Sequence, residues 1–139
     1  MAQLNSNLEH ELQQMYARTE HWISDYIFFE DEIKFLSNLL DHYFVGLIIS
    51  DSSKLELLRL TTRRLMELDI ERESIAKENE ATLIDISKLL KNEAAFDPAE
   101  FRETYADIEN EHVGFLKRYR AIKKDIYDLS NKLKTTGNS

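Results

Sequence analysis

Residues 8–47 read LEHELQQMYARTEHWISDYIFFEDEIKFLSNLLDHYFVGL, and mostly apolar side chains recur along this stretch in alternating steps of four and three. No proline interrupts the pattern. A repeat of 3.5 residues that is sustained over five or six heptads is typical of a long helix that packs as in a coiled coil. The stretch therefore predicts one helix over about residues 6–49.

The same repeat returns twice further along the chain. Residues 101–133 follow it closely. Along residues 55–90 the repeat carries several polar side chains, since it falls on Leu55, Leu58, Thr62, Leu65, Asp69, Arg72, Ala76, Asn79, Leu83, Ile86 and Leu90. Asp97 followed by Pro98 and Glu100 marks a helix start, because an aspartate caps free N–H groups and proline fits the first helical position. The predicted second and third helices cover about residues 53–92 and 97–134, and the ends at 1–5 and 135–139 are predicted to fray.

Two further patterns support these starts. The sequences SNLE at residues 6–9 and SKLE at residues 53–56 are capping boxes, in which a serine and a glutamate satisfy each other's backbone N–H groups. Phe96 and Phe101 flank the third start at the spacing of a hydrophobic staple. Three starts predict three helices.

Long helices joined by short connections become antiparallel neighbours. We therefore predict an all-α fold, namely an elongated antiparallel three-helix bundle with coiled-coil-like heptad packing that self-associates. A chain of 139 residues is the usual length of one domain, so we expect a single helical domain over residues 1–139.

The composition excludes several classes of protein. Cysteine is absent, which excludes disulfide frameworks, thiolate zinc sites and iron–sulfur clusters. The three glycines stand apart and cannot form a loop that cradles a phosphate. No apolar run approaches the ~20 residues of a spanning helix, and the first residues lack the basic and apolar regions of a secretory signal. We expect an acidic cytoplasmic protein that contacts no membrane and holds no cofactor.

Four polar residues fall at core positions of the repeat, where they are predicted to form a polar core layer: His112, Asn79, Arg72 and Asp69. A buried polar residue commonly fixes the register of packed helices. Folding the chain on paper brings His112 level with Trp22. It also brings Arg72 level with Phe29 and Tyr119 and within reach of Glu30. At that position the guanidinium could stack on an aromatic ring, or it could bind a small anion.

The alternative to a structural layer is a metal site. Glu109 and His112 form a Glu-x-x-His step, which places both side chains on one helix face, and His21 is the nearest further ligand. Di-iron bundles use two such steps and two more glutamates. Only one step is present here, so the sequence favours the structural layer over metal binding.

Charge is unevenly distributed along the chain, which has a net charge of −8. A basic patch is predicted at the end of the bundle near the first turn, opposite an acidic end, and it comprises Arg59, Arg63, Arg64, Lys117, Arg118, Arg120, Lys123 and Lys124. Acidic residues interleave with this patch, which disfavours nucleic acid as a partner. An acidic protein, or the acidic end of a second copy, fits the patch better.

Phe28 and Phe35 lie one position away from the predicted core seam of the first helix, in a column with His21 and His42. Such a wide apolar stripe belongs either to a helix that is covered on both flanks or to a dimer interface. We take Phe28 and Phe35 as a candidate interaction face and leave both readings open.

The sequence thus favours a non-enzymatic protein–protein interaction or scaffolding module, with a second copy (a homodimer) and another protein as its candidate partners. Catalysis is disfavoured because the helical seam offers neither a strained turn to expose a nucleophile nor oxyanion donors. The alternative function is a metal- or small-ligand-binding helical bundle that uses His112 and Glu109.

Overall fold

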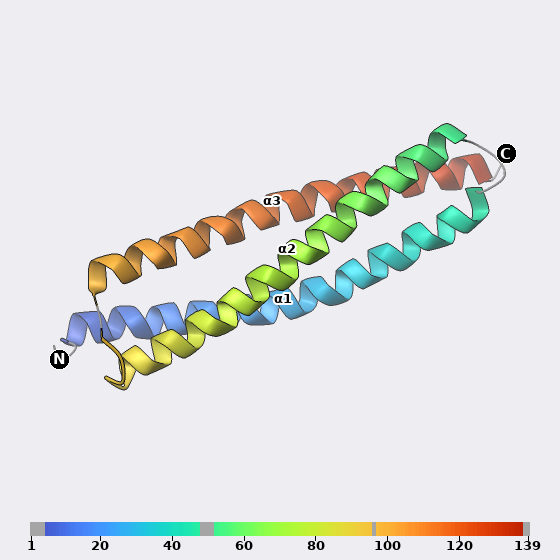
Figure 1. Cartoon of the computed structure of the whole chain (residues 1–139). Helices are drawn as coiled ribbons and strands as arrows, with labels where there is room; N and C mark the ends of the chain where they lie inside the picture. Colours follow the sequence, from blue (N-terminus) through green and yellow to red (C-terminus); the bar gives the residue numbers. More distant parts are fainter. Residues whose placement is uncertain (1–4, 48–51, 96, 138–139) are drawn as a thin grey trace. The chain divides into compact units, whose positions relative to one another are not determined.

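The computed structural model describes residues 5–47, 52–95 and 97–137 of the chain. These residues form three long α-helices and no strand: α1 (Ser6–Leu47), α2 (Ser52–Leu90) and α3 (Pro98–Gly137) (Figure 1). The predicted all-α fold with three packed helices is confirmed. Within the described ranges, no helix combines the length and the apolar character that crossing a membrane requires.

The helix starts agree with the predicted ones to within one residue. Asp97 caps α3, because its Oδ1 accepts hydrogen bonds from the backbone N–H groups of Ala99 (3.1 Å) and Glu100 (3.4 Å). At the start of α1 the cap is Asn5 rather than Ser6, since Asn5 Oδ1 accepts from the backbone N–H of Leu8 at 2.8 Å. An asparagine is as good a cap as a serine, so the sequence alone did not separate the two.

The helix ends differ more. α3 continues to Gly137, so residues 135–137, which were expected to fray, are helical. α2 ends at Leu90, and Asn92 follows in the left-handed conformation with φ of 58°. The N–H of Glu93 bonds to the Lys88 carbonyl at 2.9 Å, which closes a Schellman cap. Predictions for residues 1–4, 48–49, 96 and 138–139, including the Phe96 staple, lie outside the described residues.

Contacts divide the chain into two compact units, and each unit contains a segment of all three helices. The first unit comprises residues 1–28 and 73–113, and the second comprises residues 29–72 and 114–139. Each is described separately below.

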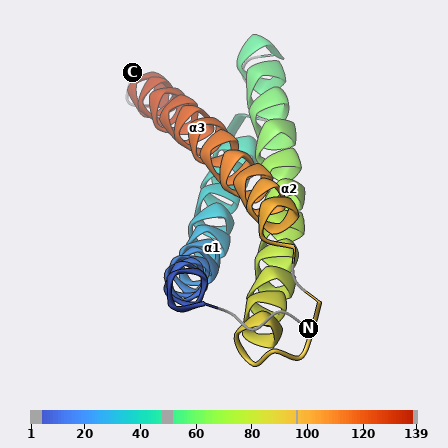
Figure 2. The ribbon, with the colours of Figure 1, turned by 90° about the vertical axis from the view of Figure 1, so that its left-hand side faces the viewer.

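The core of the first unit draws on segments of all three helices, which Figure 2 shows in a second view. Its buried cluster consists of Leu12, Trp22, Ile86, Leu89, Tyr105 and Ile108. The Thr19 and Tyr105 hydroxyl groups lie 3.3 Å apart, and the Tyr26 hydroxyl lies 3.0 Å from His112 Nδ1. Both contacts join residues that are 86 positions apart, so α1 and α3 run parallel in this unit.

The second unit has a more apolar, aromatic core. Phe29 lies between the rings of Phe115 and Tyr119, with centroid distances of 5.5 and 4.8 Å. The hydroxyl groups of Tyr43 and Ser130 lie 2.8 Å apart and join residues 87 positions apart, so α1 and α3 are parallel here too. α2 runs antiparallel to α3, because Arg64 pairs with Asp125 whereas the later Glu71 pairs with the earlier Arg118.

The buried seam of α2 differs from the predicted one at every second position. Leu68 is buried where the repeat pointed to Asp69, and Ile75 is buried where it pointed to Ala76. The buried positions are Leu58, Thr61, Leu65, Leu68, Arg72, Ile75, Asn79, Thr82, Ile86 and Leu89. From each position that both patterns share, such as Leu58, Leu65 and Arg72, the predicted pattern steps by four residues and then by three. The observed pattern steps by three and then by four, which places Leu68 and Ile75 in the core.

Candidate functional site

A polar layer lies in the core of the first unit. His112 contacts the Tyr26 hydroxyl through Nδ1, and its ring centroid lies 5.1 Å from that of Trp22. Burial lowers the pKa of His112, against nearby Asp25 and Glu109, which raise it. The imidazole is therefore neutral at neutral pH, and it acts as a buried hydrogen-bonding side chain.

The residues proposed as metal ligands are engaged with other partners. Glu109 Oε2 accepts a hydrogen bond from Arg18 at 3.0 Å, and His21 Nε2 lies 3.7 Å from an oxygen of Asp25. Among the residues that the structure describes, no group of three or more histidine, aspartate and glutamate side chains could hold a metal ion. The arrangement around His112 gives no support to the metal alternative.

Asn79 is buried in the same unit, as predicted for the polar layer, but it is not satisfied there. Its side chain is 1% exposed, and neither its Nδ2 nor its Oδ1 has a hydrogen-bond partner. A buried amide that makes no hydrogen bond costs about 1–3 kcal/mol of stability. Asn79 is therefore a weak point in the packing of the first unit.

Arg72 is buried in the second unit and pairs with two carboxylates. Its Nε donates to Asp69 Oδ1 at 2.7 Å, and its Nη1 lies 3.7 Å from Glu30 Oε2. Asp69 itself is not in the core layer: its side chain is 47% exposed, and Leu68 occupies the buried position. Arg72 thus packs its stem inside while its guanidinium reaches carboxylates at the rim, as long basic side chains commonly do.

The predicted basic patch lies entirely in the second unit, but its members fall into two groups. Arg64 pairs with Asp125 at 2.9 Å, Lys123 pairs with Glu32 at 2.9 Å, and Arg118 pairs with Glu71. The other five are exposed and have no ion-pair partner among the described residues: Arg59, Arg63, Lys117, Arg120 and Lys124. Only these five are available to a partner molecule.

Phe28 and Phe35 are both exposed, by 59% and 57%. The structure also exposes apolar residues on the outside of α2 in the second unit, which the sequence analysis did not single out: Leu60, Met66 and Ile70. Arg59, Arg63, Met66 and Ile70 are spaced by four, three and four residues, so they lie on one face of the helix. We call these four residues with Leu60 the basic outer face.

Ion pairs between α1 and α3 repeat with the heptad, a feature that the sequence analysis missed. Each pair joins residues 91 positions apart. The first unit holds Glu11–Arg102 and Arg18–Glu109, and the second holds Glu32–Lys123. Arg102 donates two hydrogen bonds of 2.8 Å and lowers the pKa of Glu11. The recurrence of opposite charges at one fixed separation was the signal that could have revealed this register.

The seam between α2 and α3 carries ion pairs in the second unit. Arg64 and Asp125 form one, and one heptad further along α2 Glu71 receives two hydrogen bonds from Arg118. Gly114 leaves room for this guanidinium, since a Cβ there would lie 3.3 Å from Arg118 Nη1. The seam of this unit is therefore charge-paired.

The seam of the first unit carries an acidic pair instead. Glu78 lies one heptad after Glu71, and Glu111 lies one heptad before Arg118. Burial raises the pKa of Glu78 to about 7, and the hydrogen bond and charge of Glu111 act in the same direction.

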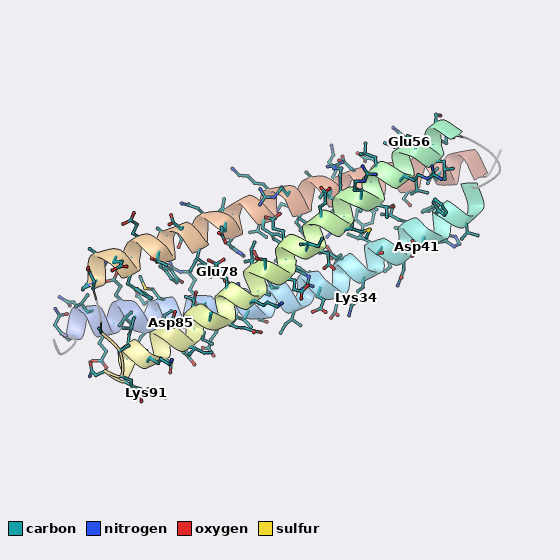
Figure 3. All side chains as sticks on the ribbon, in the orientation of Figure 1. Lys34, Asp41, Glu56, Glu78, Asp85 and Lys91 are labelled. Carbon is teal, nitrogen blue, oxygen red and sulfur yellow. The ribbon has the colours of Figure 1, made fainter. Side chains whose placement is uncertain are left out.

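A groove lies beside this acidic pair, also in the first unit. It has a volume of about 350 Å³ and is lined by Thr82, Asp85, Lys88, Leu89, Ala94, Ala95, Asp97, Glu100, Phe101, Thr104, Tyr105 and Ile108. Thr82 lies one turn after Glu78, and Ile108 lies one turn before Glu111. Figure 3 shows Glu78 and Asp85 in this order along α2, and Lys91 just after the helix ends. The groove thus continues the line of contact that the acidic pair begins.

The two units differ in what their surfaces offer. The second presents unpaired arginines beside exposed Leu60, Met66 and Ile70 on α2, whereas the first presents a polar core, an acidic pair and a groove. No protein-family model, curated protein or solved structure matches this chain. Its function is therefore inferred from these features alone.

Proposed function

We propose that the chain is a non-enzymatic, cytoplasmic protein–protein interaction module that associates with copies of itself through the basic outer face of the second unit. The observation that carries the proposal is the combination on this face of unpaired arginines with exposed apolar side chains. Met66 and Ile70 are 61% and 70% exposed, next to Arg59 and Arg63. Apolar side chains bounded by unpaired charges are typical of interaction surfaces.

The charge balance of the two units supports a second copy as the partner. The first unit contains 15 acidic and 5 basic residues, whereas the second contains 11 acidic and 13 basic residues. A basic face on one molecule can therefore meet an acidic first unit on another. Opposite charges steer such an encounter and set its orientation more than they set its affinity, which the apolar side chains supply.

The elongated, coiled-coil-like bundle predicted above fits this proposal, because long helices offer outer faces over their whole length. A head-to-tail contact between unlike surfaces does not close on itself and can add further copies, whereas a contact between two Phe28–Phe35 faces would close as a dimer. The number of copies at high concentration therefore distinguishes the two faces.

The test is the molar mass of the chain by sedimentation velocity and light scattering at ~0.05 M and ~0.5 M salt. Screening shortens from roughly 14 Å to roughly 4 Å over this range, so the proposed contact weakens at high salt. We expect Arg59→Glu with Arg63→Glu to leave a single-chain mass while the helical circular dichroism is retained. Met66→Ser with Ile70→Ser should weaken association at both salt concentrations.

The matched control is Lys77→Glu with Lys91→Glu, which changes the net charge by the same amount in the first unit. If this control dissociates the assembly as completely as the arginine variant, net charge rather than the basic outer face drives association. A single-chain mass for the unmodified protein at every concentration contradicts the proposal. If only Phe28→Glu with Phe35→Glu dissociates the assembly, the interface lies on α1 instead.

A further inference from the structure

We propose that the groove of the first unit is the surface that receives the basic outer face of a second copy. The incoming segment is residues 59–70 of α2, and it lies parallel to the start of α3. This inference rests on the proposed function and deepens it, because it names the acceptor surface for the same self-association.

The charge at the rim of the groove is the first argument. Asp85, Asp97 and Glu100 line the groove and are exposed, and Lys88 is the one base among the lining residues. Asp97 caps α3 with one of its oxygens, whereas Asp85 and Glu100 make no ion pair with the described residues. Three acids against one base leave a net charge of −2 at the rim. The two unpaired arginines of the basic outer face complement this charge.

The inside of the groove supplies the apolar part of the contact. The rings of Phe101 and Tyr105 stack with their centroids 6.3 Å apart, and the buried Ile108 lines the groove beside them. Methionine sulfur packs favourably against aromatic rings. Met66 and Ile70, which are 61% and 70% exposed, are therefore the side chains that this aromatic wall can cover.

Charge and apolar character follow the same order on the two helices. Along α3 the groove begins with the acids at the helix start and continues through the aromatic pair to Ile108. Along the basic outer face the arginines precede Met66 and Ile70. Residues 97–108 and 59–70 also cover the same length, roughly 16 Å at the rise of a helix. A parallel alignment therefore places arginines on acids and apolar side chains on the aromatic wall, whereas an antiparallel one places Ile70 on the acids.

The size of the groove fits the side chains of one helix face. Its volume is about 350 Å³, whereas a ~16 Å length of helix that is about 10 Å wide occupies on the order of 1,000 Å³. The helix thus stays outside and inserts the side chains of its basic outer face. Helices that bind in grooves commonly do so through residues spaced by three and four positions, as the residues of this face are.

The groove and the basic outer face are different surfaces, so a copy that uses one of them keeps the other for the next contact. Two variants that each lack one surface should therefore complement each other when they are mixed. The groove variant is Asp85→Arg with Glu100→Arg, and the face variant is Arg59→Glu with Arg63→Glu.

The experiment measures molar mass by sedimentation velocity and light scattering at ~0.05 M salt, where screening is weak. We expect each variant alone to have a single-chain mass while its helical circular dichroism is retained. Their equimolar mixture should associate, because the intact arginines of the groove variant meet the intact acids of the face variant. Recovery in the mixture also shows that both variants are folded.

The matched control is Glu20→Arg with Glu80→Arg, which changes the net charge by the same amount at exposed positions of the first unit that do not line the groove. It should associate as the unmodified chain does. If it dissociates as completely as the groove variant, net charge rather than the groove governs association, and the inference is overturned.

A cross-linking measurement tests the parallel alignment without changing any charge. The chain contains no cysteine, so single cysteines can be placed freely. In oxidised glutathione, Ile70→Cys should form a disulfide with Thr104→Cys of a second copy several-fold more often than with Ala95→Cys, which lies at the acidic end of the groove. The reverse preference overturns the parallel alignment, and equal yields overturn docking in the groove.

Failure of this inference and failure of the proposed function give different results. If the face variant is a single chain but the groove variant associates as the unmodified chain does, the basic outer face binds another surface and the groove is overturned alone. If the face variant itself still associates, the proposed function is wrong and the groove falls with it.

Discussion

The seam between α2 and α3 differs between the two units in how charge is arranged along it. In the second unit each acid faces a base, as in Arg64–Asp125 and Glu71–Arg118. In the first unit Glu78 faces Glu111, and beyond it lies a groove. The same heptad geometry thus supports a satisfied contact in one unit and an unsatisfied contact in the other.

The cores of the two units also differ in how well their buried side chains are satisfied. The second unit packs Phe29, Phe115 and Tyr119 together, whereas the first unit buries His112 and the unpartnered Asn79. Local stability follows buried apolar contacts and satisfied polar groups. The second unit is therefore expected to be the more stable of the two.

The largest effects come from matched core truncations, one in each unit. Leu65→Ala in the second unit and Ile86→Ala in the first each remove a side chain that is no more than 2% exposed. Each should cost about 2–5 kcal/mol, measured as the free energy of unfolding in urea. Hydrogen exchange should show the larger loss of protection in the unit that carries the substitution. Uniform loss in both units would remove the separate stabilities on which the comparison rests.

Asn79→Leu should stabilise the chain. The substitution replaces a buried amide without hydrogen bonds by an apolar side chain of similar size, so we expect a gain of about 1–3 kcal/mol in the free energy of unfolding. Asn38→Leu on the exposed side of the second unit is the control and should change stability by less than about 0.5 kcal/mol. A destabilised Asn79→Leu would show that the amide has a partner in solution.

Acid should destabilise the first unit through His112. Burial lowers its pKa, so the folded chain resists the proton that the unfolded chain binds, and stability present above pH 6.5 is lost as the pH falls. The slope cannot exceed about 1.4 kcal/mol per pH unit for one proton. His112→Gln keeps a neutral partner for Tyr26 and should flatten this limb of the urea profile. An unchanged slope between pH 6.5 and 5 would assign it to other groups.

The smallest effects come from exchanging charge along the seam. Glu111→Lys converts the first unit to the pattern of the second and should add about 0.5–1 kcal/mol at pH 8, because the new lysine can pair with Glu78. Arg118→Gln in the second unit should remove a similar amount. Both changes should shrink in ~0.5 M salt, since positions 111 and 118 are exposed to solvent. Thermal unfolding at two salt concentrations measures them.

The regularity of each helix determined how far the sequence could predict the fold. In α3 every repeat position from Tyr105 to Leu133 is buried, because apolar residues occupy one face and polar residues the others. In α2 either Thr61 or Thr62, and either Leu68 or Asp69, could occupy the buried position. The repeat predicted Thr62 and Asp69, whereas Thr61 and Leu68 are buried. Which residue is buried depends on the side chains that α1 and α3 place opposite α2. The sequence of α2 alone does not contain that information.

The site depended on interhelical register in the same way. The contacts of Arg72 with Glu30 and of His112 with Trp22 were found on paper, since a shift of about one turn leaves long side chains within reach. The other interhelical ion pairs required the exact register. The pairing of Lys123 with Glu32, which removes a lysine from the basic patch, and the contact of Glu78 with Glu111 became visible only with the register in place.

The fixed separation of 91 residues in the pairs Glu11–Arg102 and Arg18–Glu109 restricts how this sequence can change length during evolution. One inserted residue in α1 between Glu11 and Arg18 turns one side chain by about 100° relative to the other, and the two pairs can no longer form together. An insertion in the connection before α3 keeps the same side chains on each helix face. It changes only how far α3 is displaced along its axis relative to α1. Related chains should therefore gain or lose whole heptads within helices, and single residues only between them.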